Sequence, residues 1–246
     1  EKIVFEKTSK LLDSNIIVAK QSLATTQKHI KRTISKNLSN KIFFDENFSI
    51  SNGENGFFYY EDKFGSLKLP SPNILGQFQL ENISTAIATL KLLNIGIKNE
   101  HIINGITKIK NIARLQEIKF GKLKKLVKKN QLILDGSHNE DGARVLNEYL
   151  QTLEGNKHVI LGMMANKDHK KYISYFKNIS SLTTVDIPNQ PNSISGKKLK
   201  EKLNEFHNIQ YKESLREAIK SVDLKDNDLL IITGSLYLCG EFLNLN

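Results

Sequence analysis

The sequence predicts an α/β protein in two parts, and three observations predict it. After about residue 115, short apolar segments alternate with amphipathic ones across short connections, which is typical of a parallel sheet covered on both faces. Before that point, several short apolar segments separated by Asn, Gly and Asp indicate a small antiparallel meander. The pattern changes where Asn111 begins a linker, so we expect one domain over residues 1–111 and another over residues 112–246.

In the first part, residues 15–19 predict a short strand, and residues 22–36 have the length and polarity of a surface helix. The expected strands of the meander are residues 41–45, 48–51, 56–60 and 63–67. From Gln79 onward, apolar side chains recur at helical spacing and predict one amphipathic helix. Residues 99–110 predict a second helix that ends at the linker.

In the second part, strands and helices are expected to alternate. The expected strands are residues 131–135, 158–163, 182–187, 209–211 and 228–233. Helices are expected after Asn139 through residue 153 and at residues 170–176, 195–206, 214–222 and 235–243. Ligands of parallel α/β sheets bind at the carboxyl ends of the strands, so residues 135–139, 162–168 and 234–235 are expected along one edge.

The composition narrows the class of protein. With 246 residues, 39% hydrophobic and 25% charged, the chain can form one large domain or two modest ones. Its apolar stretches are too short to span a bilayer, and no leader pattern marks it for export. The single cysteine, Cys239, excludes an intramolecular disulfide and a cysteine metal cluster. We therefore expect a cytoplasmic protein that does not bind membranes.

The net charge of +10 has three interpretations. It can indicate a nucleic-acid partner, attraction for anionic substrates, or a coding bias toward Lys, Asn and Ile. The lysines are scattered, and aromatic residues do not alternate with the densest run, residues 122–129, as a single-strand binding surface requires. We favour a solvated basic surface and no nucleic-acid partner.

Polar residues that follow the strand at 131–135 are the first candidates for chemistry. Asp135 at the strand end can accept hydrogen bonds from ribose hydroxyls, and His138 can donate to a phosphate or carboxylate near the next helix N-terminus. The alternative is that Asp135 or Asn139 caps that helix and His138 is a surface residue.

A second candidate group surrounds the start of the helix near residue 79. Gln77, Gln79 and Asn82 place amide groups there, and amides can both donate to and accept from an adenine edge. The alternative is routine helix capping. Arg114 lies just after the linker, where nucleotide sites between domains are found. No G-x-x-x-x-G-K-[ST] occurs in the sequence, so these residues contain no phosphate-binding loop of that type.

Several segments in order resemble one family. Four are I-V-F-E-K at residues 3–7, S-P-N-I-L-G-Q-F-Q-L-E-N at residues 71–82, A-R-L-Q at residues 113–116 and L-D-G-S-H-N at residues 134–139. Residues 16–21, 162–168 and 233–238 complete the series. Together they resemble the folylpolyglutamate synthase/dihydrofolate synthase family, which is related to the ligases that build the peptidoglycan peptide.

The resemblance implies a fold, a reaction and two cofactors. The fold is the C-terminal part of a P-loop-type ATPase domain followed by a Rossmann-like glutamate-ligase domain. The reaction uses ATP and Mg²⁺ to phosphorylate a carboxylate of dihydropteroate or folate, and the amine of L-glutamate then attacks the acyl phosphate. Because phosphorylation supplies the leaving group, no enzyme nucleophile is needed.

The resemblance also implies roles for individual residues. Lys7, if carbamylated, is expected to bind Mg²⁺ and to be catalytic. Asn82, Arg114 and Asp135 match positions that contact ATP, and we expect all three to converge on one nucleotide pocket. Two further positions match residues that bind glutamate or complete the active site: His138, also assigned as catalytic, and Ser235.

The sequence departs from the family pattern in several places. Phe78 replaces a usual His, Ile83 replaces an Ala, and Thr8 and Ser9 stand where Ala-Gly is common. The phosphate-binding loop of the family lies before the position that matches Glu1, so we expect residues 1–246 alone not to turn over ATP. We also expect a monomer. The alternatives are a cell-wall-type amino-acid ligase and a basic nucleic-acid-binding protein.

Overall fold

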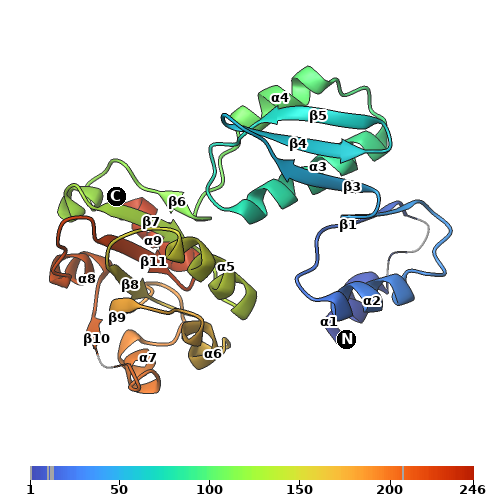
Figure 1. The fold of residues 1–246 in the computed structure, drawn as a ribbon. Coiled ribbons are helices and arrows are strands. Elements are labelled where there is room, and N and C mark those ends of the chain that lie inside the picture. Colours follow the sequence, from blue (N-terminus) through green and yellow to red (C-terminus); the bar gives the residue numbers. More distant parts are fainter. Residues whose placement is uncertain (1, 10, 12–13, 207) are drawn as a thin grey trace. The chain divides into compact units, whose positions relative to one another are not determined.

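A computed structural model describes residues 2–9, 11, 14–206 and 208–246. The chain divides into two compact units, Glu1–Lys110 and Asn111–Asn246, one residue before the expected boundary (Figure 1).

The first unit contains the expected antiparallel meander, with three strands instead of four. The strands are β3 (Phe48–Asn52), β4 (Phe57–Asp62) and β5 (Gly65–Pro70), paired in the order β3-β4-β5. Alternate side chains such as Phe58 and Tyr60 on β4 and Leu69 on β5 point inward and are buried. They form a core with Ile83 and Ile87, so the helix that carries Asn82 is anchored on this sheet.

The expected strand at residues 41–45 is not a strand of the meander, although Phe44 forms an isolated bridge with Phe48 of β3, and that pairing was predicted wrongly. Residues Lys41–Phe43 form β2, which pairs in parallel with β1 (Ile16–Val18) in a separate two-stranded sheet. The chain turns at Asp45, whose φ is 65°, and Asn47 accepts a hydrogen bond from the backbone N–H of Phe43. Apolar alternation identifies a strand, but its partner is decided by packing between distant segments.

The described residues of the first unit include four helices. They are α1 (Lys2–Thr8), α2 (Ala24–Thr33), α3 (Gln77–Leu93) and α4 (Asn99–Thr107). The amphipathic pattern near residue 79 is confirmed as α3, which begins after Gly76 (φ 97°) and ends at Asn94 in the left-handed conformation. The sequence did not predict that the segment with Lys7 is helical.

The second unit contains the predicted parallel sheet. Its strands are β6 (Gln116–Glu117), β7 (Gln131–Asp135), β8 (Lys157–Leu161), β9 (Ile179–Val185), β10 (Ile209–Lys212) and β11 (Leu229–Thr233). Their order is β10-β9-β8-β11-β7-β6, and every pair is parallel except β6 with β7. The fold class is confirmed, whereas the short edge strand β6 was not predicted.

Helices cover both faces of this sheet (Figure 1). They are α5 (Glu140–Gln151), α6 (His169–Ser174), α7 (Gly196–Lys202), α8 (Leu215–Ser221) and α9 (Leu236–Leu245), with a 3₁₀ turn η1 (Lys124–Val127). The chain crosses the sheet in one direction from β7 to β10 and returns to β11, so right-handed crossovers place α8 on the face opposite α5, α6 and α7. Leu132 and Leu134 of β7 join the core under α8, α9 and η1, whereas Ile133 between them does not.

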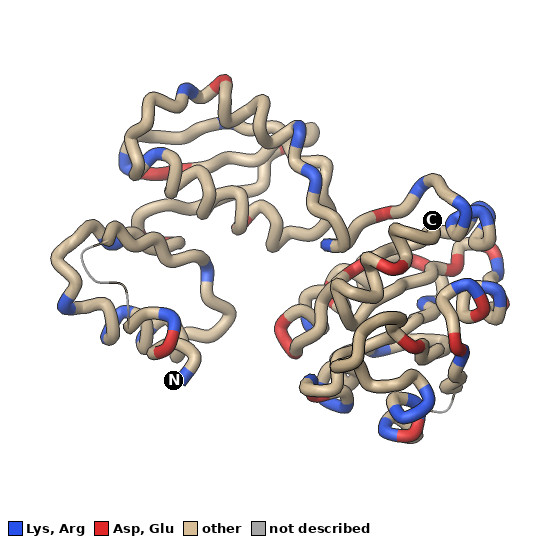
Figure 2. Tube along the Cα trace, turned by 180° about the vertical axis from the view of Figure 1, so that it is seen from behind, with Lys and Arg blue, Asp and Glu red and all other residues tan. Residues whose placement is uncertain are grey.

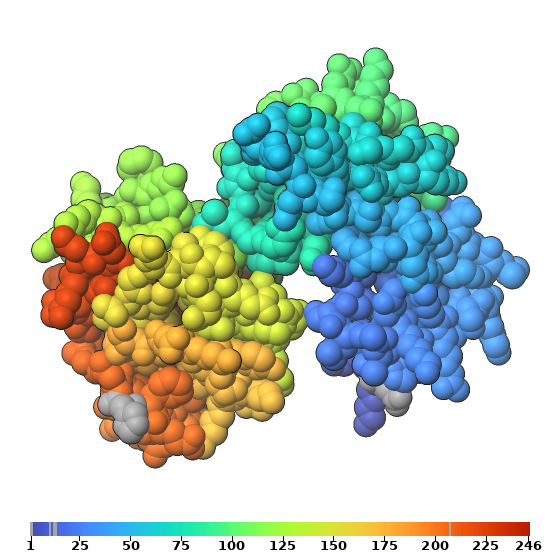
Figure 3. Space-filling model, viewed as in Figure 1, coloured from blue at the N-terminus to red at the C-terminus, as the bar shows by residue number. Residues whose placement is uncertain are grey.

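The last helix is tied to the segment before β7. The Asn246 side chain accepts hydrogen bonds from the backbone N–H groups of Leu123 (3.1 Å) and Lys124 (2.9 Å), and it donates one to the Phe120 carbonyl (2.8 Å). The two segments lie side by side on the surface (Figure 3). Figure 2 shows Lys and Arg residues over both units. The segment before β7 includes the lysine-rich run at residues 122–129.

No helix in the described part of the chain is long and apolar enough to cross a membrane.

A buried polar cluster closes the end of the sheet opposite the predicted site. Asp228, which is 2% exposed, accepts hydrogen bonds from the Lys225 backbone N–H (2.8 Å), the Asn156 amide (2.9 Å) and His158 Nε2 (3.2 Å). Burial raises the pKa of the Asp228 carboxyl, but these hydrogen bonds outweigh it and the net pKa lies below the ordinary value. The charged carboxylate therefore contributes to folding stability.

This cluster predicts a pH dependence of unfolding. Because the folded-state pKa of Asp228 is depressed, its contribution is complete above the unfolded pKa of about 4 and is lost as pH falls through the folded value. We expect the free energy of unfolding from urea titrations to fall as pH is lowered from about 5 to 3. The variant Asp228→Asn should be less stable by about 1–3 kcal/mol at pH 7 and should show a smaller slope. An identical slope in both proteins would contradict this assignment.

Candidate active site

The carboxyl ends of the central strands meet at one edge of the second unit. Asp135 at the end of β7 pairs with Thr233 at the end of β11, and Thr233 pairs with Leu161 at the end of β8. Backbone hydrogen bonds join the loops that follow, from Gly162 N–H to the Thr233 carbonyl (3.3 Å) and from Gly234 N–H to the Ser137 carbonyl (3.1 Å). The structure therefore brings the three predicted loop segments to one edge of the sheet.

A cluster of buried hydroxyl groups connects the strand ends at this edge of the sheet. Tyr172 of α6 lies 2.9 Å from Ser137 Oγ and 2.8 Å from Thr233 Oγ1, measured from its hydroxyl oxygen. Burial raises the pKa of the Tyr172 phenol, so the group stays neutral and can donate. Tyr172 thus links the ends of β7 and β11. Tyr172 could not be identified from the sequence, because nothing in the spacing of α6 indicates its partners.

The Asp135 carboxylate forms hydrogen bonds with the backbone of the protein. It is 4% exposed, and its two oxygens accept hydrogen bonds from the backbone N–H groups of Leu115 (2.8 Å) and Ser137 (2.9 Å). The predicted contact with ribose hydroxyls is not shown by this geometry. What the geometry shows is a carboxylate that connects the A-R-L-Q segment to the loop after β7.

Arg114 lies in that segment, next to the Asp135 loop. Its side chain is partly buried, and within the described residues its guanidinium makes no hydrogen bond or ion pair. Arg114 and Asp135 both act electrostatically on the buried Cys239 thiol. Burial is the largest cause that raises the pKa of that thiol, Asp135 also raises it and Arg114 lowers it, and the net pKa is about 12. A cation near a strand end, with donors not used by the protein, is suited to bind an anion.

His138 and Ser235 lie at the same edge but differ in exposure. His138 is partly buried, and its Nδ1 lies 3.0 Å from the Gly136 carbonyl oxygen. Ser235 is 2% exposed and caps α9, since its hydroxyl accepts a hydrogen bond from the Tyr237 N–H (3.1 Å). Asn139 caps α5 by accepting from the Gly142 N–H (2.9 Å), which is the capping alternative considered for this loop.

Two predicted residues belong to the first unit. Asn82 is exposed on α3, and its side-chain amide lies 3.4 Å from the Gln79 side-chain oxygen. Lys7 is exposed on α1. At the same helix start as Asn82, Glu81 accepts a hydrogen bond from Lys20 (2.9 Å), and this bond raises the pKa of Lys20. The expected convergence of Asn82 with Arg114 and Asp135 stays a prediction.

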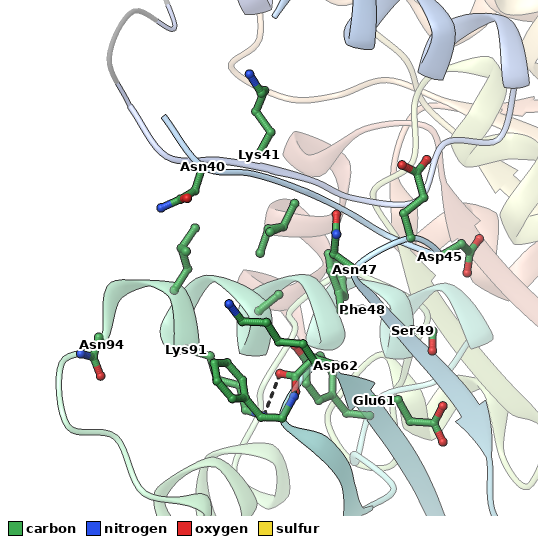
Figure 4. A pocket seen from close by; sticks show the side chains of 17 residues that line it. Asn40, Lys41, Asp45, Asn47, Phe48, Ser49, Glu61, Asp62, Lys91 and Asn94 are labelled. Carbon is green, nitrogen blue, oxygen red and sulfur yellow. Dashed lines mark hydrogen bonds and ion pairs between the residues drawn. The ribbon is translucent and has the colours of Figure 1, made fainter. Parts of the chain in front are cut away.

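A pocket of about 750 Å³ also lies in the first unit, between the β4–β5 turn and the end of α3 (Figure 4). Asp62 and Lys91 line it and form an ion pair with a distance of 2.9 Å. Lys91 also lies 4.9 Å from the centre of the buried Tyr60 ring. None of the predicted site residues lines this pocket, so it is separate from the chemistry inferred from the sequence.

Comparison with known proteins agrees with this architecture. Residues 122–236 match the family described as Mur ligase, glutamate ligase domain. The folylpolyglutamate synthase of Lacticaseibacillus casei is 28% identical over 209 residues, covering 80% of this chain and 46% of that protein. The dihydrofolate synthase/folylpolyglutamate synthase of Haemophilus influenzae is 26% identical over 185 residues, covering 68% and 42%. The chain thus spans about half the length of these relatives.

Solved structures share the fold. Folylpolyglutamate synthase from Mycobacterium tuberculosis, complexed with ADP and AMPPCP, has a TM-score of 0.83 and 16% identity, covering 99% of this chain and 59% of that one. The Thermotoga maritima enzyme has a TM-score of 0.76 and 22% identity, covering 100% and 58%. Residues 122–236 of the second unit therefore match a Mur-type glutamate ligase domain, and the chain is similar to proteins of the folylpolyglutamate synthase/dihydrofolate synthase family.

Proposed function

We propose that this chain contributes to the ATP-dependent ligation of L-glutamate to a folate-type carboxylate. The observation that carries the proposal lies at the carboxyl edge of the second unit, where Arg114 is next to the Asp135 loop. The Arg114 guanidinium makes no hydrogen bond or ion pair with the described residues, so its donors are available to a ligand. Relatives of this family are named for glutamate addition to folates, and the M. tuberculosis relative is complexed with ADP and AMPPCP.

In the proposed reaction, ATP phosphorylates the carboxylate of dihydropteroate or a folate, and L-glutamate displaces phosphate to form an amide. Arg114 offers a planar cationic fork to the phosphates, which neutralises charge as the acyl phosphate forms. His138 is partly exposed at the same edge and can donate to the glutamate carboxylate. Ser235 is buried, so its contribution is to fix the start of α9. The residues of this chain position the substrates and neutralise negative charge, and phosphate is the leaving group.

In this proposal, a carbamylated Lys7 binds Mg²⁺. A solved relative from Yersinia pestis, 19% identical, is complexed with AMPPNP and Mn ion. Across the described residues of this chain, no three His, Cys, Asp or Glu side chains are grouped as a metal site. The assignment of Mg²⁺ to Lys7 stays a prediction, and no step is assigned to the metal.

The comparisons do not favour a cell-wall-type ligase or a nucleic-acid-binding protein, because the matched curated relatives are folate enzymes. Part of the basic run is neutralised locally, since Lys129 pairs with Asp226 (2.8 Å). Just before the run, Lys119 lies 3.6 Å from Glu117. The cytoplasmic location and the monomeric state remain predictions.

A chimera tests the proposal directly. This chain replaces the matching region of the L. casei enzyme, and incorporation of radiolabelled L-glutamate into dihydropteroate or tetrahydrofolate is measured with ATP and Mg²⁺. We expect incorporation that requires ATP, and a loss of roughly 10-fold or more with Arg114→Ala in the chimera. A correctly folded chimera that binds ATP but never incorporates glutamate would contradict the proposed reaction.

A further inference from the structure

Ser137 is the residue at which three segments of the carboxyl edge meet, and it is only 5% exposed. Its N–H donates to the Asp135 carboxylate (2.9 Å), and its carbonyl accepts from the Gly234 N–H (3.1 Å). Its hydroxyl lies 2.9 Å from the hydroxyl of Tyr172. The loop after β7 is therefore bonded to the loop after β11 and to α6 through a single residue.

These bonds fix both peptide planes that flank Ser137. A peptide unit is planar, so a hydrogen bond at its N–H or at its carbonyl restrains the direction of the other group. The Gly136–Ser137 unit is held by the Ser137 N–H, and its carbonyl oxygen lies 3.0 Å from His138 Nδ1. The unit that joins Ser137 to His138 is held by the Ser137 carbonyl. The backbone on both sides of Ser137 therefore orients His138.

The contact with the Gly136 carbonyl also determines which ring nitrogen of His138 carries the proton. A carbonyl oxygen can only accept, so Nδ1 must donate across the 3.0 Å contact. In the neutral ring Nε2 then has a lone pair, and in the protonated ring it is a second donor. In either state Nε2 is the ring nitrogen left for a ligand, because it makes no hydrogen bond among the described residues.

We infer that Tyr172 is a positioning residue: its hydroxyl fixes Ser137, and Ser137 fixes the orientation and the tautomer of His138. Tyr172 is fully buried, and its hydroxyl also lies 2.8 Å from Thr233 Oγ1 at the end of β11. Its ring packs against Phe176, with 5.4 Å between the ring centres, so core packing sets the place of the hydroxyl. The consequence for glutamate binding rests on the proposed function, whereas the consequence for His138 geometry does not.

NMR of the His138 ring tests the inference without any ligand. The tautomer is read from the ¹⁵N shifts of the two ring nitrogens at a pH where the ring is neutral. We expect the Nδ1–H form to dominate in the unaltered chain. In Tyr172→Phe, the ratio of Nδ1–H to Nε2–H should fall at least about threefold, as part of the roughly fivefold factor that one net hydrogen bond contributes.

Amide hydrogen exchange gives an independent reading. The Gly234 N–H donates to the Ser137 carbonyl, so its exchange rate reports how firmly Ser137 is held. Tyr172→Phe should raise this rate about three- to tenfold relative to the amide of Ile231 in β11, which reports global unfolding. Ser137→Ala removes the same bond from the other side. The double variant should exchange no faster than the faster of the two single variants.

Tyr211→Phe is the matched control. Tyr211 belongs to the same sheet, and its hydroxyl donates to the Asp186 carboxylate (2.7 Å) and not to Ser137. The substitution removes one hydrogen-bonded phenol hydroxyl while the contacts of Ser137 stay intact. The His138 tautomer ratio and the relative exchange rate of Gly234 should both be unchanged. Equal changes in Tyr211→Phe and Tyr172→Phe would overturn the inference, because they would show only a general loss of stability.

The chimera with the L. casei enzyme tests the consequence for glutamate. Tyr172→Phe should raise the KM for L-glutamate about threefold or more and leave kcat within about twofold, because His138 is assigned to substrate binding. Added to His138→Ala, the same substitution should raise KM no further. An unchanged KM in Tyr172→Phe, or increases that multiply in the double variant, would overturn the glutamate part of the inference.

The positioning part has its own decisive outcomes. An unaltered tautomer ratio or an unaltered relative exchange rate of Gly234 in Tyr172→Phe would overturn it. If Tyr172→Phe does not fold, Ser137→Ala decides by the same two measurements. If a folded chimera with every residue intact incorporates no glutamate, the proposed function fails, and the two measurements on the chain still decide whether Tyr172 positions His138.

Discussion

Replacing Arg114 with alanine is expected to weaken ADP binding by roughly 10- to 100-fold, because a charge-assisted hydrogen bond contributes about 1.5–3 kcal/mol. The guanidinium is partly exposed at the carboxyl edge of the sheet and makes no hydrogen bond or ion pair among the described residues. Its removal should therefore affect ligand binding more than folding. The chain with and without the substitution is titrated with ADP by calorimetry, and thermal melting confirms that the fold is intact.

Two variants make this test specific. Arg114→Lys keeps the charge but not the planar fork, so it should lie between the unaltered chain and Arg114→Ala. Arg144→Ala removes an equal charge from α5, where Arg144 is paired with Asp141 and Glu148 at 2.7 Å each, and it should leave the affinity nearly unchanged. Equal losses for Arg114→Ala and Arg144→Ala would mean that only net charge matters.

Replacing Gly234 with alanine is expected to lower the free energy of unfolding by roughly 2–5 kcal/mol, from backbone strain together with overpacking. Gly234 follows β11 with φ 104°, a conformation that alanine rarely adopts. A Cβ there would stand 2.7 Å from the Gly162 carbonyl oxygen and 2.6 Å from a Leu161 methyl. These neighbours belong to the edge of the sheet, so the substitution should also disturb the loops of the site.

Gly240 in α9 is the matched control. A Cβ at that position has no neighbour within 4 Å, and alanine is favoured over glycine in a helix by up to about 1 kcal/mol. Urea unfolding followed by circular dichroism should place the midpoint of Gly234→Ala well below that of the unaltered chain, and that of Gly240→Ala at or slightly above it. Coincident midpoints for the two variants would contradict the packing described at Gly234.

Much of the second unit follows from local sequence patterns. The apolar segment at β7 was predicted with its exact bounds, because it is buried on both faces and ends in a carboxylate followed by glycine. The strand–helix alternation was sufficient to predict that Asp135 and Gly234 lie at one edge. The pairing of β2 could not be predicted in this way, because Ile16 and Lys41 are separated by a helix and their pairing is non-local.

The candidate site was only partly predictable. The motifs indicated Arg114 and Asp135, but their spacing does not show that Asp135 accepts a hydrogen bond from Leu115, which lies 20 positions earlier. Tyr172 was missed for the same reason, since its partners come from other strands. Ser235 carried a usable signal, because a serine just before a helix is a common cap.

The most direct measurement is a map of backbone NMR shifts as ADP is added to isotope-labelled chain. The account predicts that the largest shifts fall on Arg114, Leu115, Ser137 and Gly234, the residues at the carboxyl edge of the second unit. Shifts centred instead on the pocket around Lys91, or saturable ADP binding that leaves this edge unperturbed, would contradict it.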